Sequence, residues 1–212
     1  GNGNGHSKKK EEPPVQSAIE PKKWKMKVQV IENFVNKEEI NELNTWALSN
    51  FIKYPNQYVD PCMDPHHPRS RLTNRISNIH QRHNQFSINY PKIVYDIQER
   101  IIDALKLKKF FVPPPFHHGI VNGIGFGEGL IEKHVDPVYY PNTITLHCNL
   151  ITQKSESGGV TIIDGIEYDI DSEDLLCYPV SELHHEVTLT KGNINRILWC
   201  FGFCIPKNVW WK

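Results

Sequence analysis

The sequence predicts an α+β fold that is mainly β, with two N-terminal helices packed on one side of a β sandwich or barrel. Two stretches with helical periodicity, 36–51 and 91–107, lie in the first half of the 212-residue chain. From residue 118 onward, short apolar runs alternate with turn residues, and no helical period returns. Several short strands that follow a pair of helices are typical of a β core covered by helices on one face.

The first predicted elements are a strand and a helix. The stretch "KWKMKVQVIENFV" alternates and is rich in Val, so it predicts a strand that begins near Trp24. Asn36, followed three residues later by Glu39, matches a helix capping box. The apolar stripe of this first helix is Ile40, Leu43, Ala47 and Phe51. In the second helix Pro91 suits the first turn, and the apolar stripe is Val94, Ile97, Ile101 and Leu105.

Residues 24–212 are predicted to form a single domain with a long loop at about 54–90. The loop contains many Pro, Asp and Asn residues. Long loops in compact domains often act as lids or binding loops, and a solvated loop is the alternative. Residues 1–23 are rich in Gly, Lys, Glu and Pro and lack the apolar segment of a signal peptide. They predict a disordered leader or an expression remnant.

Charge and cysteine content argue against several classes of protein. Lys+Arg and Asp+Glu both number 24, so the net charge gives no general attraction to nucleic acid or to a membrane surface. No apolar run approaches the roughly 20 residues of a membrane helix. The five cysteines contain no CxxC pair, which argues against a disulfide scaffold or a cysteine zinc site. We therefore expect a cytoplasmic or otherwise intracellular protein without a membrane partner.

The stretch "HVDPVYY" at 134–140 carries the strongest chemical signal. Residues i and i+2 of an extended segment point the same way, so His134 and Asp136 can share one metal ion. Two histidines and one carboxylate, with open positions for other ligands, bind iron for oxygen chemistry. A His-x-Asp pair alone is more often a turn carboxylate beside a surface histidine, so a third ligand from a distant strand is needed.

The stretch "ELHHEVTLTKGNINRILWCFGF" supplies that ligand and a cation. The apolar residues of its first strand share parity with His185, and a half-buried strand turns its apolar side inward. His185 is therefore expected to face the interior, and His184 is the alternative if a β-bulge lies at the pair. Arg196 precedes the apolar run "ILWCFGF" and is expected to have a partner there.

Together, "HVD" at 134–136, "HHE" at 184–186 and Arg196 resemble the iron- and 2-oxoglutarate-dependent dioxygenases, over roughly residues 28–205. The stretch "VIENFVNKEEINEL" resembles the strand–helix entry of prolyl- and lysyl-hydroxylase-like members. The resemblance implies a double-stranded β-helix, which is a distorted jelly roll. It also implies hydroxylation of an unactivated C–H bond, with conversion of 2-oxoglutarate and O2 to succinate and CO2 and with ascorbate in support.

The resemblance implies a role for each candidate residue. His134, Asp136 and His185, with His184 as the alternative, would hold Fe(II). Arg196 would form a bidentate salt bridge with the distal carboxylate of 2-oxoglutarate. The candidates for the other end of this cosubstrate are Asn122, His147 and Asn149, although His147 equally fits a buried core histidine. The candidate substrate contacts are Tyr139, Tyr140, Arg71 and Arg75.

Two departures from the family pattern bear on the substrate. Arg196 follows His185 by eleven residues, where the family often has ten. Position 202 is Gly, where nucleic-acid demethylases typically carry a second Arg. We therefore expect a protein or peptide substrate, of prolyl or lysyl type, rather than nucleic acid. The alternatives are a hydroxylase of a nucleobase, a small molecule or an amino acid, and a non-enzymatic cupin-like metal-binding module.

Overall fold

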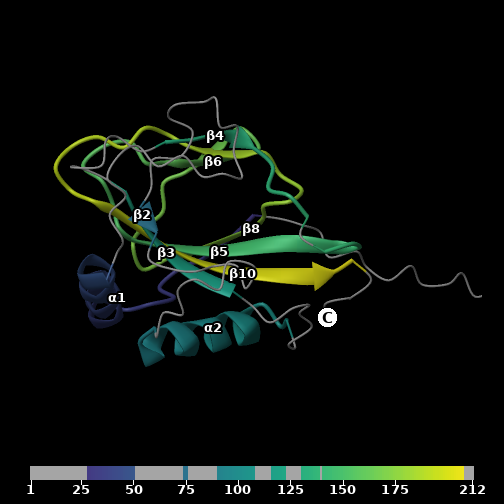
Figure 1. The fold of residues 1–212 in the computed structure, drawn as a ribbon, viewed down its shortest axis with the longest axis horizontal. Coiled ribbons are helices and arrows are strands. Elements are labelled where there is room, and N and C mark those ends of the chain that lie inside the picture. Colours follow the sequence, from purple (N-terminus) through teal and green to yellow (C-terminus); the bar gives the residue numbers. More distant parts are fainter. Residues whose placement is uncertain are drawn as a thin grey trace, which may run out of the picture.

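The computed structural model describes residues 28–50, 90–107, 130–138 and 140–207, together with the backbone of 74–75 and 116–122. Figure 1 shows three layers: two helices lie under the larger of two β-sheets, and the smaller sheet faces the other side of the larger one. The predicted leader 1–23 and most of the predicted loop 54–90 lie outside the described residues. None of the helices in the described part of the chain has the length and apolarity needed to cross a membrane.

Both sheets are antiparallel. The larger sheet has, in spatial order, β1 (Gln29–Ile31), β8 (Leu175–Pro179), β5 (Thr143–Gln153), β10 (Arg196–Pro206), β3 (Phe116–Asn122) and β2 (Asn74–Arg75). The smaller sheet has β4 (Ile131–His134), β9 (His185–Val187), β6 (Thr161–Ile163) and β7 (Ile166–Tyr168). From β3 to β10 the chain passes back and forth between the two sheets. This winding is that of a double-stranded β-helix, so the predicted fold is confirmed.

The two predicted helices are α1 (Lys37–Asn50) and α2 (Lys92–Ala104). The capping box of α1 is confirmed, because Glu39 N donates to Asn36 Oδ1 at 2.8 Å and Asn36 N donates to Glu39 Oε1 at 3.2 Å. The helix α2 ends three residues before the predicted position, since Lys106 adopts a left-handed backbone with φ 53°.

One prediction for the loop differs from the structure. Within the predicted loop, Asn74 and Arg75 form β2, which is an edge strand of the larger sheet and pairs with β3 at Val121 and Ile120. The run "GGVTIIDGIEYDI" contains two strands, β6 and β7. The chain reverses between them at Asp164 and Gly165, which both have positive φ values (50° and 77°).

Two cores lie on the two faces of β10. Trp199, Phe201 and Phe203 are fully buried against the helices, and each burial contributes about 1.5–3 kcal/mol to stability. The alternate residues Leu198 and Cys200 face the space between the sheets. The other members of that inner cluster are Ile151, Ile163, Ile170, Leu176, Tyr178 and Val180. The candidate functional residues lie in this inner layer.

Candidate metal centre

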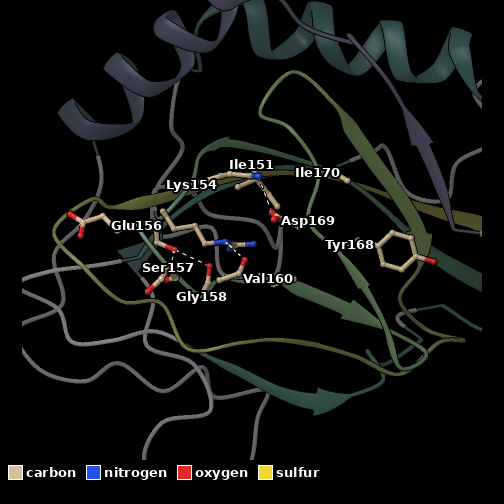
Figure 2. Close-up of a pocket in the computed structure, with 12 residues that line it drawn as sticks. Ile151, Lys154, Glu156, Ser157, Gly158, Val160, Tyr168, Asp169 and Ile170 are labelled. Carbon is tan, nitrogen blue, oxygen red and sulfur yellow. Dashed lines mark hydrogen bonds and ion pairs between the residues drawn. The ribbon is translucent and has the colours of Figure 1, made fainter.

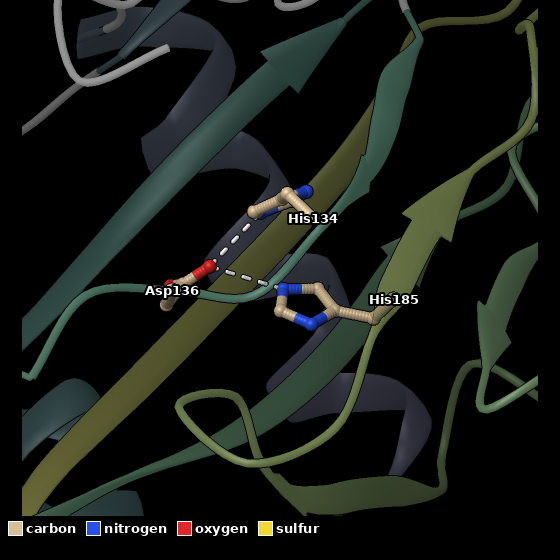
Figure 3. A group of neighbouring side chains, drawn as sticks. All are labelled: His134, Asp136 and His185. Atoms are coloured by element: carbon tan, nitrogen blue, oxygen red, sulfur yellow. Dashed lines mark hydrogen bonds and ion pairs between the residues drawn. The ribbon is translucent and has the colours of Figure 1, made fainter.

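Strand pairing in the smaller sheet brings three candidate ligands together. His134 ends β4 and His185 begins β9, and these two residues are direct cross-strand partners. Asp136 follows β4 and is held by its backbone N–H, which donates to Val180 O at 2.8 Å. Figure 3 shows one carboxylate oxygen of Asp136 facing both imidazole rings, with a dashed line to each. The ligand atoms of the three residues all lie within 4.8 Å of one another.

One oxygen of Asp136 faces both imidazoles. Asp136 Oδ1 lies 2.9 Å from His134 Nε2 and 3.1 Å from His185 Nε2. The three side chains are 15%, 10% and 7% exposed for His134, Asp136 and His185. The site is therefore largely shielded from solvent, and its polar atoms depend on one another or on a bound ion.

The other nitrogen of each imidazole faces a backbone carbonyl. His134 Nδ1 lies 2.5 Å from Glu132 O, and His185 Nδ1 lies 2.8 Å from Leu183 O. A carbonyl oxygen only accepts, so each Nδ1 donates its proton there, and each Nε2 can either donate a second proton to Asp136 or bind a metal ion. Either a second proton on each imidazole or one divalent cation satisfies this cluster. Such a carbonyl contact is typical of metal-binding histidines, so the donor set fits a metal ion.

The electrostatics of Asp136 favour its ionised form. Burial by itself raises the pKa of Asp136, but the hydrogen bonds from His134 and His185 and the charge of His147 outweigh burial, so the pKa lies well below its ordinary value. The carboxylate is therefore ionised across the working pH range and is available as a ligand.

Arg196 is a buried cation with an incomplete set of partners. It is 2% exposed, and its Nε donates to Gly159 O at 3.1 Å. Within the described residues its Nη2 is buried and has no acceptor. Burial lowers the pKa of Arg196 to about 10, against an opposing effect of Tyr178. A buried guanidinium with an unused donor is costly, and this position therefore fits an anionic ligand.

A cavity of about 270 Å³ reaches Arg196 from the loop that joins β5 to β6. Figure 2 shows Lys154 and Asp169 at this cavity, joined by an ion pair of 2.8 Å. The residues that line the cavity are Ile151, Lys154, Ser155, Glu156, Ser157, Gly158, Gly159, Val160, Tyr168, Asp169, Ile170 and Arg196. The three candidate metal ligands do not line this cavity. Arg196 lines the cavity and also borders the inner layer between the sheets.

Two more polar residues on β5 face the inner layer. Asn149 is 6% exposed, and its Oδ1 has no partner in the part of the chain that the structure describes. His147 Nε2 lies 3.9 Å from Asp136 Oδ2. Both residues, which the sequence predicts near the cosubstrate, thus lie in the same layer as the candidate metal ligands and Arg196.

Tyr178 is a residue of this layer that the sequence reasoning missed. Its ring packs edge-on against His185 with centroids 5.2 Å apart, and it also affects the pKa of Arg196. Tyr178 therefore lies near both the three candidate metal ligands and the buried cation. The inward parity of Tyr178 and Leu176 in "DLLCYP" was the available signal.

The remaining candidates have different positions. His184 is exposed, whereas His185 is buried at the cluster. Tyr140 is half-buried, and its carbonyl accepts from Thr143 Oγ1. The backbone of Asn122 pairs with Arg196. The side chain of Asn122 and those of Tyr139, Arg71 and Arg75 lie outside the described part, so their roles stay predictions.

No family model and no curated protein matches the sequence. Solved structures do match the fold. A viral collagen prolyl hydroxylase from Paramecium Bursaria Chlorella virus-1, in complex with 2OG, matches with TM-score 0.57 and 12% identity over 84% of this chain and 96% of that chain. A prolyl-4-hydroxylase from Pseudomonas putida matches with TM-score 0.56 and 12% identity over 86% and 94%.

HygX from Streptomyces hygroscopicus, with nickel and 2-oxoglutarate bound, matches with TM-score 0.53 and 12% identity over 88% of this chain and 86% of that chain. At this level of identity the likeness concerns the fold. The chain therefore shares the double-stranded β-helix of these three proteins along most of its length.

Proposed function

We propose that the protein is an iron- and 2-oxoglutarate-dependent oxygenase that hydroxylates a C–H bond on a protein or peptide side chain. One observation carries the proposal: the cluster of His134, Asp136 and His185 occupies the same inner layer as a buried arginine with an unused donor. A metal ion and a carboxylate ligand are the two groups that these features fit.

His134, Asp136 and His185 would hold Fe(II) through two imidazole nitrogens and one carboxylate oxygen. This donor set leaves positions for other ligands and is the one that non-haem iron oxygenases use. When bound, iron with 2-oxoglutarate and O2 supplies the conversion to succinate and CO2 and the transfer of one oxygen atom to a C–H bond. The carbonyls of Glu132 and Leu183 keep both imidazoles in the tautomer that can bind the metal.

Arg196 would bind the distal carboxylate of 2-oxoglutarate. Its guanidinium is planar and suits bidentate binding of a carboxylate. Asn149 has a buried amide in the same layer and would contact the cosubstrate, as would Asn122 beside Arg196. The apolar inner cluster around these groups excludes water, which strengthens each charged contact.

A peptidyl substrate of prolyl or lysyl type has two lines of support. Two of the similar structures are named as prolyl hydroxylases, although at 12% identity. The net charge of zero and Gly202 in place of a second arginine speak against nucleic acid. Tyr139, Tyr140, Arg71 and Arg75 are the proposed substrate contacts. Nucleobase, small-molecule and amino-acid substrates are the alternatives, and the nucleoside pool in the experiment below tests the first of them.

The test incubates the protein with Fe(II), ascorbate and 2-oxoglutarate, and measures succinate in the presence of proline- and lysine-containing peptide pools or nucleoside pools. We expect succinate with a +16 Da product in a peptide pool and none with Asp136→Ala. A +16 Da nucleoside would assign the alternative substrate class. Absence of succinate with every pool, combined with tight zinc binding, would instead indicate a non-enzymatic metal-binding module.

A further inference from the structure

The carboxylate of Asp136 has three imidazoles around it, not two. Its Oδ1 faces His134 Nε2 and His185 Nε2, at 2.9 and 3.1 Å. Its Oδ2 faces the Nε2 of His147, at 3.9 Å. The two oxygens of one carboxylate thus face different groups, and only Oδ1 lies within hydrogen-bond distance of its neighbours.

The position of His147 is set by the larger sheet. His147 lies on β5, which is hydrogen-bonded to β8 on one side and to β10 on the other. Its direct cross-strand partners are Tyr178 and Gly202. The side chain is 15% exposed. Pairing on both sides restrains the backbone of His147, so a closer contact with Asp136 requires a rotation of the imidazole or a shift of the carboxylate.

Metal binding would change the hydrogen bonds that the Asp136 carboxylate accepts. A cation bound to both Nε2 atoms and to Oδ1 would replace the two hydrogen bonds that Oδ1 otherwise accepts. The side chain of Asp136 is only 10% exposed, so the remaining oxygen, Oδ2, needs a hydrogen-bond donor from the protein. A shift of about 1 Å brings His147 Nε2 and Asp136 Oδ2 to hydrogen-bond distance.

We propose that His147 is a positioning residue that donates a hydrogen bond to Asp136 Oδ2 while Oδ1 binds the metal, and that it does not bind the cosubstrate. This inference rests on the proposed function, since it concerns the same metal centre. His147 Nε2 already faces Asp136 Oδ2 at 3.9 Å, on the side of the carboxylate away from His134 and His185. Groups that orient a metal ligand in this way typically change metal affinity rather than cosubstrate affinity when they are removed.

The test measures the affinity of the whole chain for Co²⁺ by calorimetry, without 2-oxoglutarate, and records the visible absorption of the bound Co²⁺. His147→Leu removes the donor and is expected to raise the Co²⁺ Kd by about 10–100-fold and to change the absorption band. His147→Gln keeps an N–H donor near the original Nε2 and is expected to restore most of the affinity. Thr152→Val, a buried polar change on the same strand but on the helix-facing side, is the matched control and should leave the Kd unchanged.

An unchanged Co²⁺ Kd in His147→Leu, with weaker binding of 2-oxoglutarate to the Co²⁺-loaded protein, would overturn the proposal and assign His147 to the cosubstrate. If His147→Leu does not fold, His147→Gln and His147→Asn decide between the two roles. The shorter Asn amide should lose the affinity that Gln retains, and equal affinities would overturn the proposal. Failure of the wild-type chain to bind Co²⁺ would refute the proposed function itself, a result distinct from failure of the His147 variants alone.

Discussion

A β-carbon on Gly159 would lie 2.8 Å from Cδ of Arg196, so the arginine side chain passes Gly159 at a distance that only glycine allows. The carbonyl of Gly159 also accepts the Nε hydrogen bond of Arg196. Gly159 has a left-handed backbone with φ 68°, which L side chains rarely adopt. Gly159 thus accepts a hydrogen bond from Arg196 and leaves the space through which the arginine side chain passes.

Gly159→Ala is expected to weaken binding of 2-oxoglutarate to the metal-loaded protein by about tenfold or more, because a displaced guanidinium loses bidentate geometry. Calorimetry on the Co²⁺-loaded chain measures this. Gly165→Ala is the matched control, since Gly165 also has a positive φ (77°) but a β-carbon there meets nothing within 4 Å. Both variants share a backbone strain of about 1–2 kcal/mol. Equal 2-oxoglutarate affinities in the two variants would contradict the proposed role of Arg196.

Arg196→Met is expected to weaken 2-oxoglutarate binding strongly while changing the free energy of unfolding only slightly. The variant removes a buried, incompletely paired charge but also leaves Gly159 O without its donor. We therefore expect the free energy of unfolding in urea to change by less than about 2 kcal/mol. Binding of 2-oxoglutarate should weaken by about 100-fold or more, because two charge-assisted hydrogen bonds contribute about 1.5–3 kcal/mol each. A variant that binds 2-oxoglutarate as well as the wild type would sink this assignment.

His185→Ala and His184→Ala are expected to differ sharply in metal affinity. His185 is buried with its Nε2 3.1 Å from Asp136 Oδ1, whereas His184 is exposed. Calorimetric titration with Co²⁺ should give no measurable binding for His185→Ala and a wild-type Kd for His184→Ala. The reverse result would mean that a β-bulge at this pair turns the other histidine toward the site.

Asn36→Ala is expected to lower the free energy of unfolding by about 1 kcal/mol, because the N-terminal N–H groups of α1 lose the cap that Asn36 Oδ1 provides. Urea unfolding followed by circular dichroism measures the difference. Asn50→Ala is a useful comparison, since Asn50 Nδ2 donates to Trp46 O near the exposed end of the same helix. Co²⁺ affinity should be unchanged in both variants, as α1 does not contribute to the metal centre.

Local patterns in the sequence sufficed to predict the helices and the His-x-Asp pair, which supplies two of the three candidate metal ligands. The capping box at Asn36 and Glu39 and the apolar stripe of α2 depend on residues three or four positions apart. The His-x-Asp pair depends on the period of two in an extended segment. The alternation of "LHHEVTLT" likewise predicted that His185 would face inward, where the structure has it buried. These features need only the chain's own periodicity.

Long-range pairing decided the rest. His134 and His185 meet only because β4 pairs with β9, and Tyr178 joins the site only because β8 lies beside β5 in the other sheet. Two further features depend on side chains that converge from separate strands. They are the unused Nη2 donor of Arg196 and the approach of His147 Nε2 to Asp136 Oδ2. Composition and spacing determined the fold class and the kind of donor atoms in this chain. Only the packing of the two sheets against each other decided their distances and partners, because strand register and burial involve residues far apart in the sequence.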